Sequence, residues 1–121
     1  MAIHESGEMY LEAILVLKKE IPQVRAIDIV NHTGYSKPSV SRAMGILKKN
    51  GYIVVDEDGF ISFTDMGQAH AMRIYERHNV LTQFFTKLGV SDAVAEEDAC
   101  KMEHVISDET FAAMKKYLGI E

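Results

Sequence analysis

Residues 26–63, AIDIVNHTGYSKPSVSRAMGILKKNGYIVVDEDGFISF, decide the fold of this chain. Residues 26–33 suit a short helix, and a second helix begins after Ser36 with Pro38 in its first turn. Gly51 ends that helix, and two β-branched and aromatic runs follow with an acidic, glycine-ended turn between them, which predicts a hairpin. The order helix, helix, hairpin is typical of the second half of a winged helix-turn-helix.

A helix upstream completes this unit. Pro22 bars that helix from continuing, and before it apolar residues recur at i, i+3, i+4 and i+7. We expect the hairpin strands at 52–55 and 60–63, so the helices and the hairpin together predict a winged helix-turn-helix. The recurring apolar residues are Tyr10, Ala13, Ile14 and Leu17.

The remaining residues, 65–121, are predicted to be entirely helical, so the fold is mainly α. Thr64 caps a long helix to about Leu88, and Ser91 and Ser107 each start a further helix. The long helix carries His78 within its apolar stripe. We predict that the helix after Ser91 has a packing face of Ala95, Ala99, Met102 and Ile106 and a ligation face of Glu96, Cys100, Glu103 and His104.

Composition limits the protein class. A chain of 121 residues that is 47% hydrophobic can bury a core. We expect a cytoplasmic protein, because no apolar run approaches the roughly 18 residues of a membrane span and the start lacks a basic-then-apolar leader. The net charge of -5 disfavours nucleic acid, but residues 34–50 contain basic side chains and no acid.

The single cysteine suggests part of a metal site. Cys100 stands three residues before Glu103 and four before His104, so on a helix all three would share one face. Sulfur, nitrogen and oxygen together suit ferrous iron, cobalt, nickel or zinc, whereas calcium and magnesium prefer oxygen alone. The set is incomplete, so other ligands must come from another element. The alternative for such a cysteine is a small buried apolar residue.

The run CKMEHVISDE at residues 100–109, together with EMYLE at residues 8–12, resembles the metal-dependent repressors related to diphtheria toxin repressor. The likeness spans nearly the whole chain. It implies that residues 1–64 are the winged helix-turn-helix DNA-binding domain and that the helical domain of residues 65–121 binds metal and forms a homodimer. Ligands matched by this resemblance are Met9, Cys100 through its side chain and carbonyl, Glu103 and His104.

The family has an iron-sensing and a manganese-sensing branch, and this chain mixes their ligands. Met9 and Cys100 look like ligands of the iron branch. Glu12 looks like a ligand of the manganese branch, in which this carboxylate and the histidine matching His78 both bind at a second metal position. Thr82 and Glu96 depart from the second site of the iron branch. Sulfur ligands disfavour manganese, so we rank Fe²⁺ first and Mn²⁺ second, with Co²⁺, Ni²⁺ or Zn²⁺ as substitutes in vitro.

The acid-free helix after Ser36 is predicted to enter the DNA major groove. Arg42 is the best candidate there for a base contact, and Arg25 should meet a phosphate. An ordinary solvated helix face is the alternative. The predicted DNA-contacting residues are Arg25, Ser36, Lys37, Pro38, Ser39, Arg42 and Lys48.

These observations favour a metal-activated repressor that binds a palindromic operator as a homodimer. An enzyme with Cys100 as nucleophile and His104 as base lacks an orienting third group, so we predict no enzymatic activity. The remaining alternative is a winged-helix protein that binds a protein partner and carries a structural metal without metal-gated DNA binding.

Overall fold

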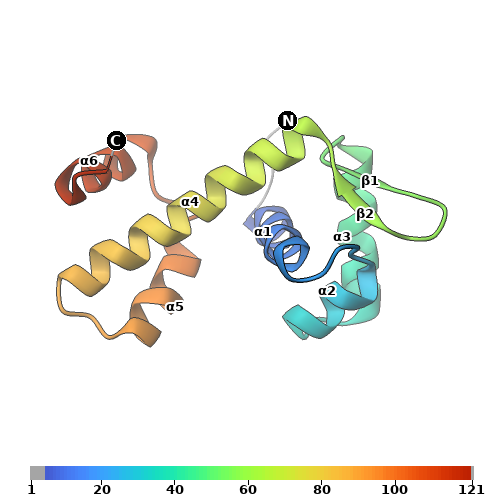
Figure 1. Cartoon of the computed structure of the whole chain (residues 1–121), viewed down its shortest axis with the longest axis horizontal. Coiled ribbons are helices and arrows are strands. Elements are labelled where there is room, and N and C mark those ends of the chain that lie inside the picture. Colours follow the sequence, from blue (N-terminus) through green and yellow to red (C-terminus); the bar gives the residue numbers. More distant parts are fainter. Residues whose placement is uncertain (1–4, 121) are drawn as a thin grey trace. The chain divides into compact units, whose positions relative to one another are not determined.

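The computed structural model describes residues 5–120 and is mainly helical (Figure 1). The chain divides into two compact units, Met1–Met72 and Arg73–Glu121, which are described separately below. None of the helices in the described range combines the length and the apolar content that a bilayer crossing requires. The elements are α1 (Glu5–Glu20), α2 (Ala26–Thr33), α3 (Lys37–Lys49), β1 (Ile53–Val55), β2 (Ile61–Phe63), α4 (Asp65–Lys87), α5 (Asp92–Met102) and α6 (Asp108–Leu118).

The first unit has the predicted helix, helix, helix, hairpin order. Gly34 ends α2 in the left-handed conformation (φ 80°), which glycine adopts without steric cost. Ser36 caps α3 by accepting the Ser39 N–H at 3.3 Å, and Pro38 occupies the first turn. Side chains from α1, the segment before α2, α2, α3 and the hairpin form the core: Leu11, Ile14, Val24, Ile29, Val40, Leu47, Ile53 and Ile61.

The hairpin is shorter than the sequence predicts. β1 and β2 pair antiparallel with Val54 opposite Ser62, and neither Tyr52 nor Phe60 belongs to a strand. The side chain of Asp56 causes part of this difference, because its Oδ1 accepts the N–H groups of Asp58 and Phe60, each at 2.9 Å. An aspartate that binds nearby backbone in this way favours a turn over a strand.

The beginning of α4 belongs to the first unit and fits tightly against the start of the hairpin. Thr64 caps α4 by accepting the Gly67 N–H at 3.1 Å. A Cβ added at Gly67 would lie 1.8 Å from the Tyr52 carbonyl oxygen, so only glycine fits there. Further along, His70 Nε2 lies 2.7 Å from Oε2 of the buried Glu8, a part-buried contact that the apolar pattern did not predict.

The second unit contains the rest of α4 together with α5 and α6. Ser107 caps α6 by accepting the Thr110 N–H at 3.1 Å, as predicted. The side-chain contacts between α4 and α6 include the rings of Phe84 and Tyr117, with centroids 5.6 Å apart, and the Lys115–Glu76 ion pair at 3.0 Å. The buried apolar side chains are Ile74, Val80, Leu81, Ala95, Ala99 and Phe111.

Candidate metal centre

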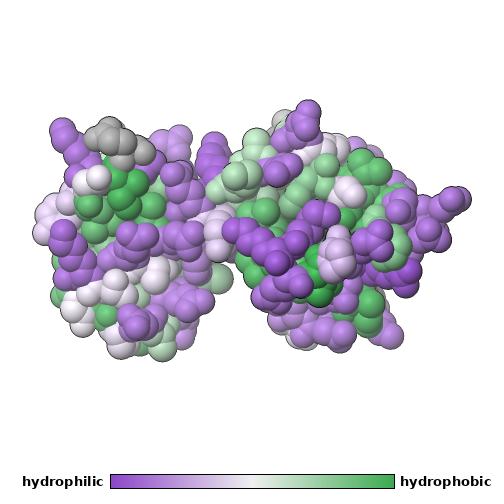
Figure 2. Space-filling view, in the orientation of Figure 1, coloured by the Kyte–Doolittle hydropathy of each residue, from purple (hydrophilic) through white to green (hydrophobic). Residues whose placement is uncertain are grey.

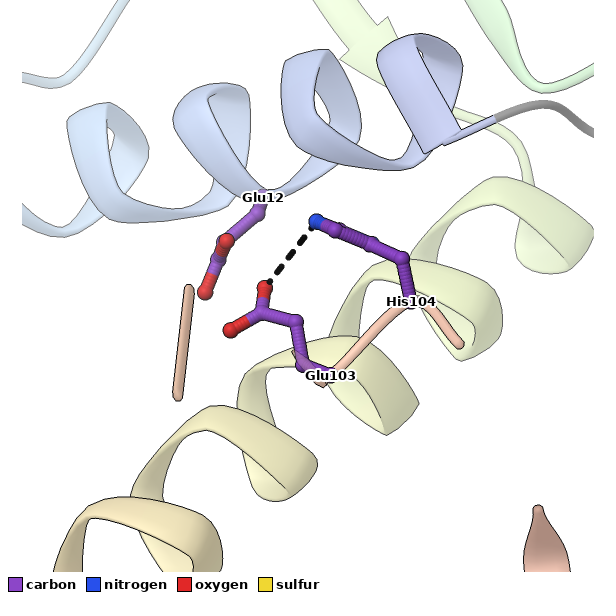
Figure 3. Close-up of side chains that lie close together, drawn as sticks. All are labelled: Glu12, Glu103 and His104. Carbon is purple, nitrogen blue, oxygen red and sulfur yellow. Dashed lines mark ion pairs between the residues drawn. The ribbon is translucent and has the colours of Figure 1, made fainter. Parts of the chain in front are cut away.

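Glu103 is the central residue of the candidate centre in the second unit. It follows the last residue of α5, keeps right-handed helical angles (φ -58°, ψ -26°) and is fully buried. Its Oε1 lies 2.7 Å from Nδ1 of His78, which α4 supplies. Its Oε2 lies 3.5 Å from Nε2 of His104, an ion pair drawn as a dashed line in Figure 3. One carboxylate therefore stands between two imidazoles.

This carboxylate is not fully satisfied by the protein. Among residues 5–120, the structure gives Oε2 of Glu103 no hydrogen-bond partner, although the atom is buried. A buried oxygen without a hydrogen bond lowers the stability of the fold by about 1–3 kcal/mol, and by more when the group is charged. A divalent cation at this position would remove that cost, and glutamate and histidine are among the side chains that bind transition metals. Glu103 and His104 also belong to a group of side chains that could hold a metal ion. The residues present therefore fit a metal.

The electrostatic surroundings of His78 favour a cation. Its hydrogen bond to Glu103 raises the pKa of the imidazole, and burial acts in the opposite direction. The negative charges of Glu103 and Glu96 raise the pKa of His78 further. A metal that binds through this ring has to replace the proton, because only a neutral imidazole can donate its electron pair.

The ligation face predicted for the helix after Ser91 is only partly correct. That helix ends at Met102, so Glu103 and His104 lie beyond it, and Met102 is exposed (36%) instead of packed. Cys100 and Glu96 lie on α5 and are both exposed. The structure thus brings His78, Glu103 and His104 together in the second unit, and it leaves Cys100 exposed.

Two further predicted ligands, Met9 and Glu12, lie on α1 of the first unit, where both side chains are partly buried. Their place on one helix follows from the pattern that predicted α1. Their participation in metal binding stays a prediction from the family resemblance.

Arg77 is a residue of this region that sequence reasoning missed. It is buried (7% exposed), and its guanidinium donates to the backbone carbonyls of Glu103 and Ile106 at 3.2 and 2.7 Å. These contacts occupy two backbone carbonyls of the segment that follows α5. A signal was present: Arg77 lies three residues after Ile74 and four before Leu81, so it falls on the apolar stripe of α4.

The predicted DNA-contacting residues occupy α3 and the residue before α2. Ser36 Oγ donates to Ser39 Oγ at 2.9 Å and also accepts the Ser39 N–H, so the hydroxyl proton of Ser39 remains available to a phosphate or a base. The guanidinium of Arg25 lies 4.3 Å from the ring centroid of Phe60. The remaining predicted residues, all exposed, are Lys37, Pro38, Arg42 and Lys48.

The acidic tip of the hairpin has the opposite charge. Asp56, Glu57 and Asp58 are all exposed and contribute to the hydrophilic surface of the hairpin (Figure 2). Carboxylates repel phosphates, so contacts from this tip to a DNA backbone are disfavoured. The exposed side chains of α3, in contrast, include basic residues and no acidic ones.

Two protein-family models match the chain in succession. The N-terminal DNA-binding domain of iron-dependent repressors matches residues 2–60, and their metal-binding and dimerisation domain matches residues 64–120. The transcriptional regulator MntR of Escherichia coli O6:H1 is 32% identical over 108 residues, covering 89% of this chain and 70% of that protein.

Two other relatives are longer than this chain. The diphtheria toxin repressor of Corynebacterium diphtheriae is 29% identical over 116 residues, which cover 94% of this chain and 51% of that protein. Among solved structures, the manganese regulator SloR superposes with a TM-score of 0.84 at 24% identity, over the whole of this chain and 56% of that one. The chain thus spans little more than half the length of these two relatives.

Proposed function

Because the chain belongs to the iron-dependent repressor family, we propose that it is a transcriptional repressor activated by ferrous iron, with manganese as the second candidate. The resemblance found in the sequence is confirmed by this membership. The relatives are transcriptional regulators, so the prediction that the chain is not an enzyme is also confirmed. We further propose that the functional boundary lies between residues 64 and 65 and that the protein acts in the cytoplasm as a homodimer.

The observation that carries the proposal is the buried carboxylate of Glu103 between His78 and His104, with one oxygen that has no hydrogen-bond partner in the described part of the chain. A bound divalent ion would supply positive charge to this carboxylate. We propose that the full ligand set is Met9, Glu12, His78, Cys100, Glu103 and His104.

The choice of iron over manganese follows from ligand softness. Met9 supplies a thioether and Cys100 a thiolate, and both disfavour manganese, the weakest binder in the divalent series. Glu12 and His78 favour the opposite choice by their likeness to the manganese branch. Affinities for the two ions, measured under the same anaerobic conditions, decide between them.

Metal would control DNA binding by linking the two units. Met9 and Glu12 belong to α1, whereas the other proposed ligands belong to the second unit. An ion bound by both sets would favour those arrangements in which two α3 helices of a dimer match half-sites about 34 Å apart or a multiple of that distance. A coupling free energy of about 1–3 kcal/mol gives 5- to 150-fold tighter DNA binding, and DNA then tightens metal binding by the same factor.

On the DNA side, we propose that α3 enters the major groove. Arg42 would make the base contact, Ser39 would donate its hydroxyl proton, and Arg25 would bind a phosphate. Lys37 and Lys48 are exposed and add positive charge to the same helix. Salt should weaken this interaction steeply, because each neutralised phosphate releases counterions.

The first experiment selects operators from a random duplex library without oxygen, using the protein with Fe²⁺, with Mn²⁺ and with a chelator. A palindrome enriched only with metal is the expected result, and the relative enrichment ranks the two ions. Equal enrichment with chelator would contradict metal gating. No enrichment under any condition would favour a protein partner instead of DNA.

The second experiment tests the link between the units with Met9→Ala. This substitution should reduce the metal dependence of binding to the selected operator. Met66→Ala is the matched control, because Met66 is an exposed methionine (50%) of the first unit outside the proposed ligand set. Unchanged metal dependence in Met9→Ala would show that α1 does not contribute to gating through this residue.

A further inference from the structure

Arg77 provides an unusual contact between α4 and the chain segment after α5. Its Nη1 donates to the carbonyls of Glu103 and Ile106, and its Nη2 donates to Asp108 Oδ1. Its guanidinium also lies near Phe111, 5.3 Å from the ring centroid. One side chain therefore binds the beginning and the end of the turn that carries Glu103 and His104.

Arg77 and His78 hold Glu103 at two different places. Successive residues of an α-helix point about 100° apart, so neighbouring side chains approach a partner from different directions. His78 binds the carboxylate at 2.7 Å, whereas Arg77 binds the backbone carbonyl at 3.2 Å. Glu103 is thus fixed at its side chain and at its backbone by consecutive residues of α4.

Stability alone does not account for a buried arginine here. Removing a guanidinium from water costs several kcal/mol, and a well-packed apolar side chain often stabilises as well or better. The Asp108 side chain is 86% exposed, so solvent screens this ion pair. In the part of the chain that the structure describes, Nε of Arg77 has no hydrogen-bond partner. What the arginine does provide is a defined path for the backbone from Glu103 to Ile106.

We propose that Arg77 is a positioning residue of the metal centre, an inference that rests on the proposed metal-binding function. It fixes the turn so that Glu103 and His104 present their ligand atoms before the ion arrives. Beyond the end of α5 at Met102, the N–H groups of Val105 and Ile106 both donate to the Met102 carbonyl, at 3.1 and 3.0 Å, while Arg77 binds the carbonyls that follow. If the turn adopts the binding conformation only part of the time, the apparent Kd rises by the inverse of that fraction.

The test compares Arg77→Lys with Glu76→Gln in the full chain. Lysine keeps the positive charge but lacks the planar fork that binds two carbonyls and a carboxylate. Glu76→Gln removes the negative charge from a different polar contact between α4 and α6, the Lys115–Glu76 pair at 3.0 Å, and does not touch the turn. We measure Co²⁺ affinity without oxygen by competition with a chelator, and the thermal unfolding of each metal-free protein.

We expect Arg77→Lys to weaken Co²⁺ binding by about 10- to 100-fold, the usual effect of losing an outer partner of metal ligands, and Glu76→Gln to leave it unchanged. The affinity is measured well below both unfolding transitions, where loss of stability alone does not change it. Equal Co²⁺ affinities of wild type and Arg77→Lys would overturn the inference and leave the proposed function intact. A wild-type chain that binds no Co²⁺ would instead overturn the proposed function.

If Arg77→Lys does not fold, Asp108→Asn replaces it. This variant keeps the arginine but weakens the contact that orients its guanidinium. A smaller loss of Co²⁺ affinity in the same direction is expected. An unchanged affinity in Asp108→Asn would then overturn the inference.

Discussion

The two units place their charged groups in opposite ways. In the first, the basic side chains Lys37, Arg42 and Lys48 project from a regular helix and are exposed. In the second, Arg77 within α4 and Glu103 directly after α5 are both buried. DNA is a large polyanion, so it can bind to a surface that presents exposed hydrogen-bond donors. A metal ion is small, so its ligand groups have to surround it, and the fold has to hold them in place away from water. The difference explains why one functional surface is regular and the other is not.

The largest expected effect tests whether the first unit depends on close packing. Gly67→Ala places a Cβ 1.8 Å from the Tyr52 carbonyl oxygen, so the hairpin or α4 must shift. We expect the free energy of unfolding to fall by about 3 kcal/mol or more. Gly45→Ala is the control, because no atom lies within 4 Å of its added Cβ and alanine in a helix gains about 0.5–1 kcal/mol over glycine. Denaturant titration measures both, and equal stabilities would contradict the packing explanation.

The next prediction tests the buried charge of the second unit. Glu103→Gln keeps the shape of the side chain and a carbonyl oxygen for His78 but removes the negative charge. We expect metal affinity to fall by more than ~100-fold, beyond the usual effect of an outer-shell partner. Glu97→Gln changes an exposed carboxylate of α5, paired with Lys101 at 3.6 Å, and should leave the affinity unchanged. Calorimetric titration of Fe²⁺ or Co²⁺ without oxygen decides, and a similar loss in both variants would contradict the assignment.

A third prediction concerns the exposed charges of α3. Arg42→Ala should weaken binding to the selected operator by about 1–3 kcal/mol and relax its preference at one base pair. Its metal affinity without DNA should stay at the wild-type value, because the side chain is exposed in the first unit. Lys116→Ala, an exposed cation of α6, is the control for a general loss of positive charge. Fluorescence anisotropy at fixed salt measures the DNA affinity, and equal losses in both variants would argue against a specific role of α3.

The smallest expected effect compares two serine caps of the second unit. Ser107 accepts the Thr110 N–H at 3.1 Å, whereas Ser91 caps α5 without a side-chain hydrogen bond. Ser107→Ala should therefore lower the free energy of unfolding by about 1 kcal/mol. Ser91→Ala should change it less. Thermal unfolding of the metal-free proteins measures both, and the reverse order would mean that the cap of α6 does not stabilise the segment after the metal turn.

Local sequence signals predicted most of the fold. Ser36, Pro38 and Gly34 defined the ends of α2 and α3 because caps, proline and left-handed glycine act within a few residues. The length of α5 was predicted less well. Its helical pattern continues through Ile106 in the sequence, but α5 ends at Met102. Arg77, which belongs to α4, binds two backbone carbonyls of the segment that follows.

The same distinction applies to the candidate site. Spacing drew attention to Cys100, Glu103 and His104, and the burial of Glu103 and its contacts to His78 and His104 agree with a role for that group. The pairing of His78 with Glu103 joins residues far apart in the chain, and the family resemblance named both as candidate ligands without pairing them. The sequence does show that Arg77 is an arginine within an apolar stripe. It could not predict the contacts of Arg77 with two backbone carbonyls, because every residue has a carbonyl.

The position of α4 has a practical consequence for dividing the protein into fragments. Its first residues pack with the winged helix-turn-helix, where Gly67 fits against Tyr52 and His70 pairs with Glu8. A DNA-binding fragment cut at the end of the hairpin would lose both contacts, and the buried Glu8 would then have no His70 beside it. A fragment that ends near Met72 retains them. Exchange of sensor units between relatives is therefore better made by splicing within α4 than at the loop before it.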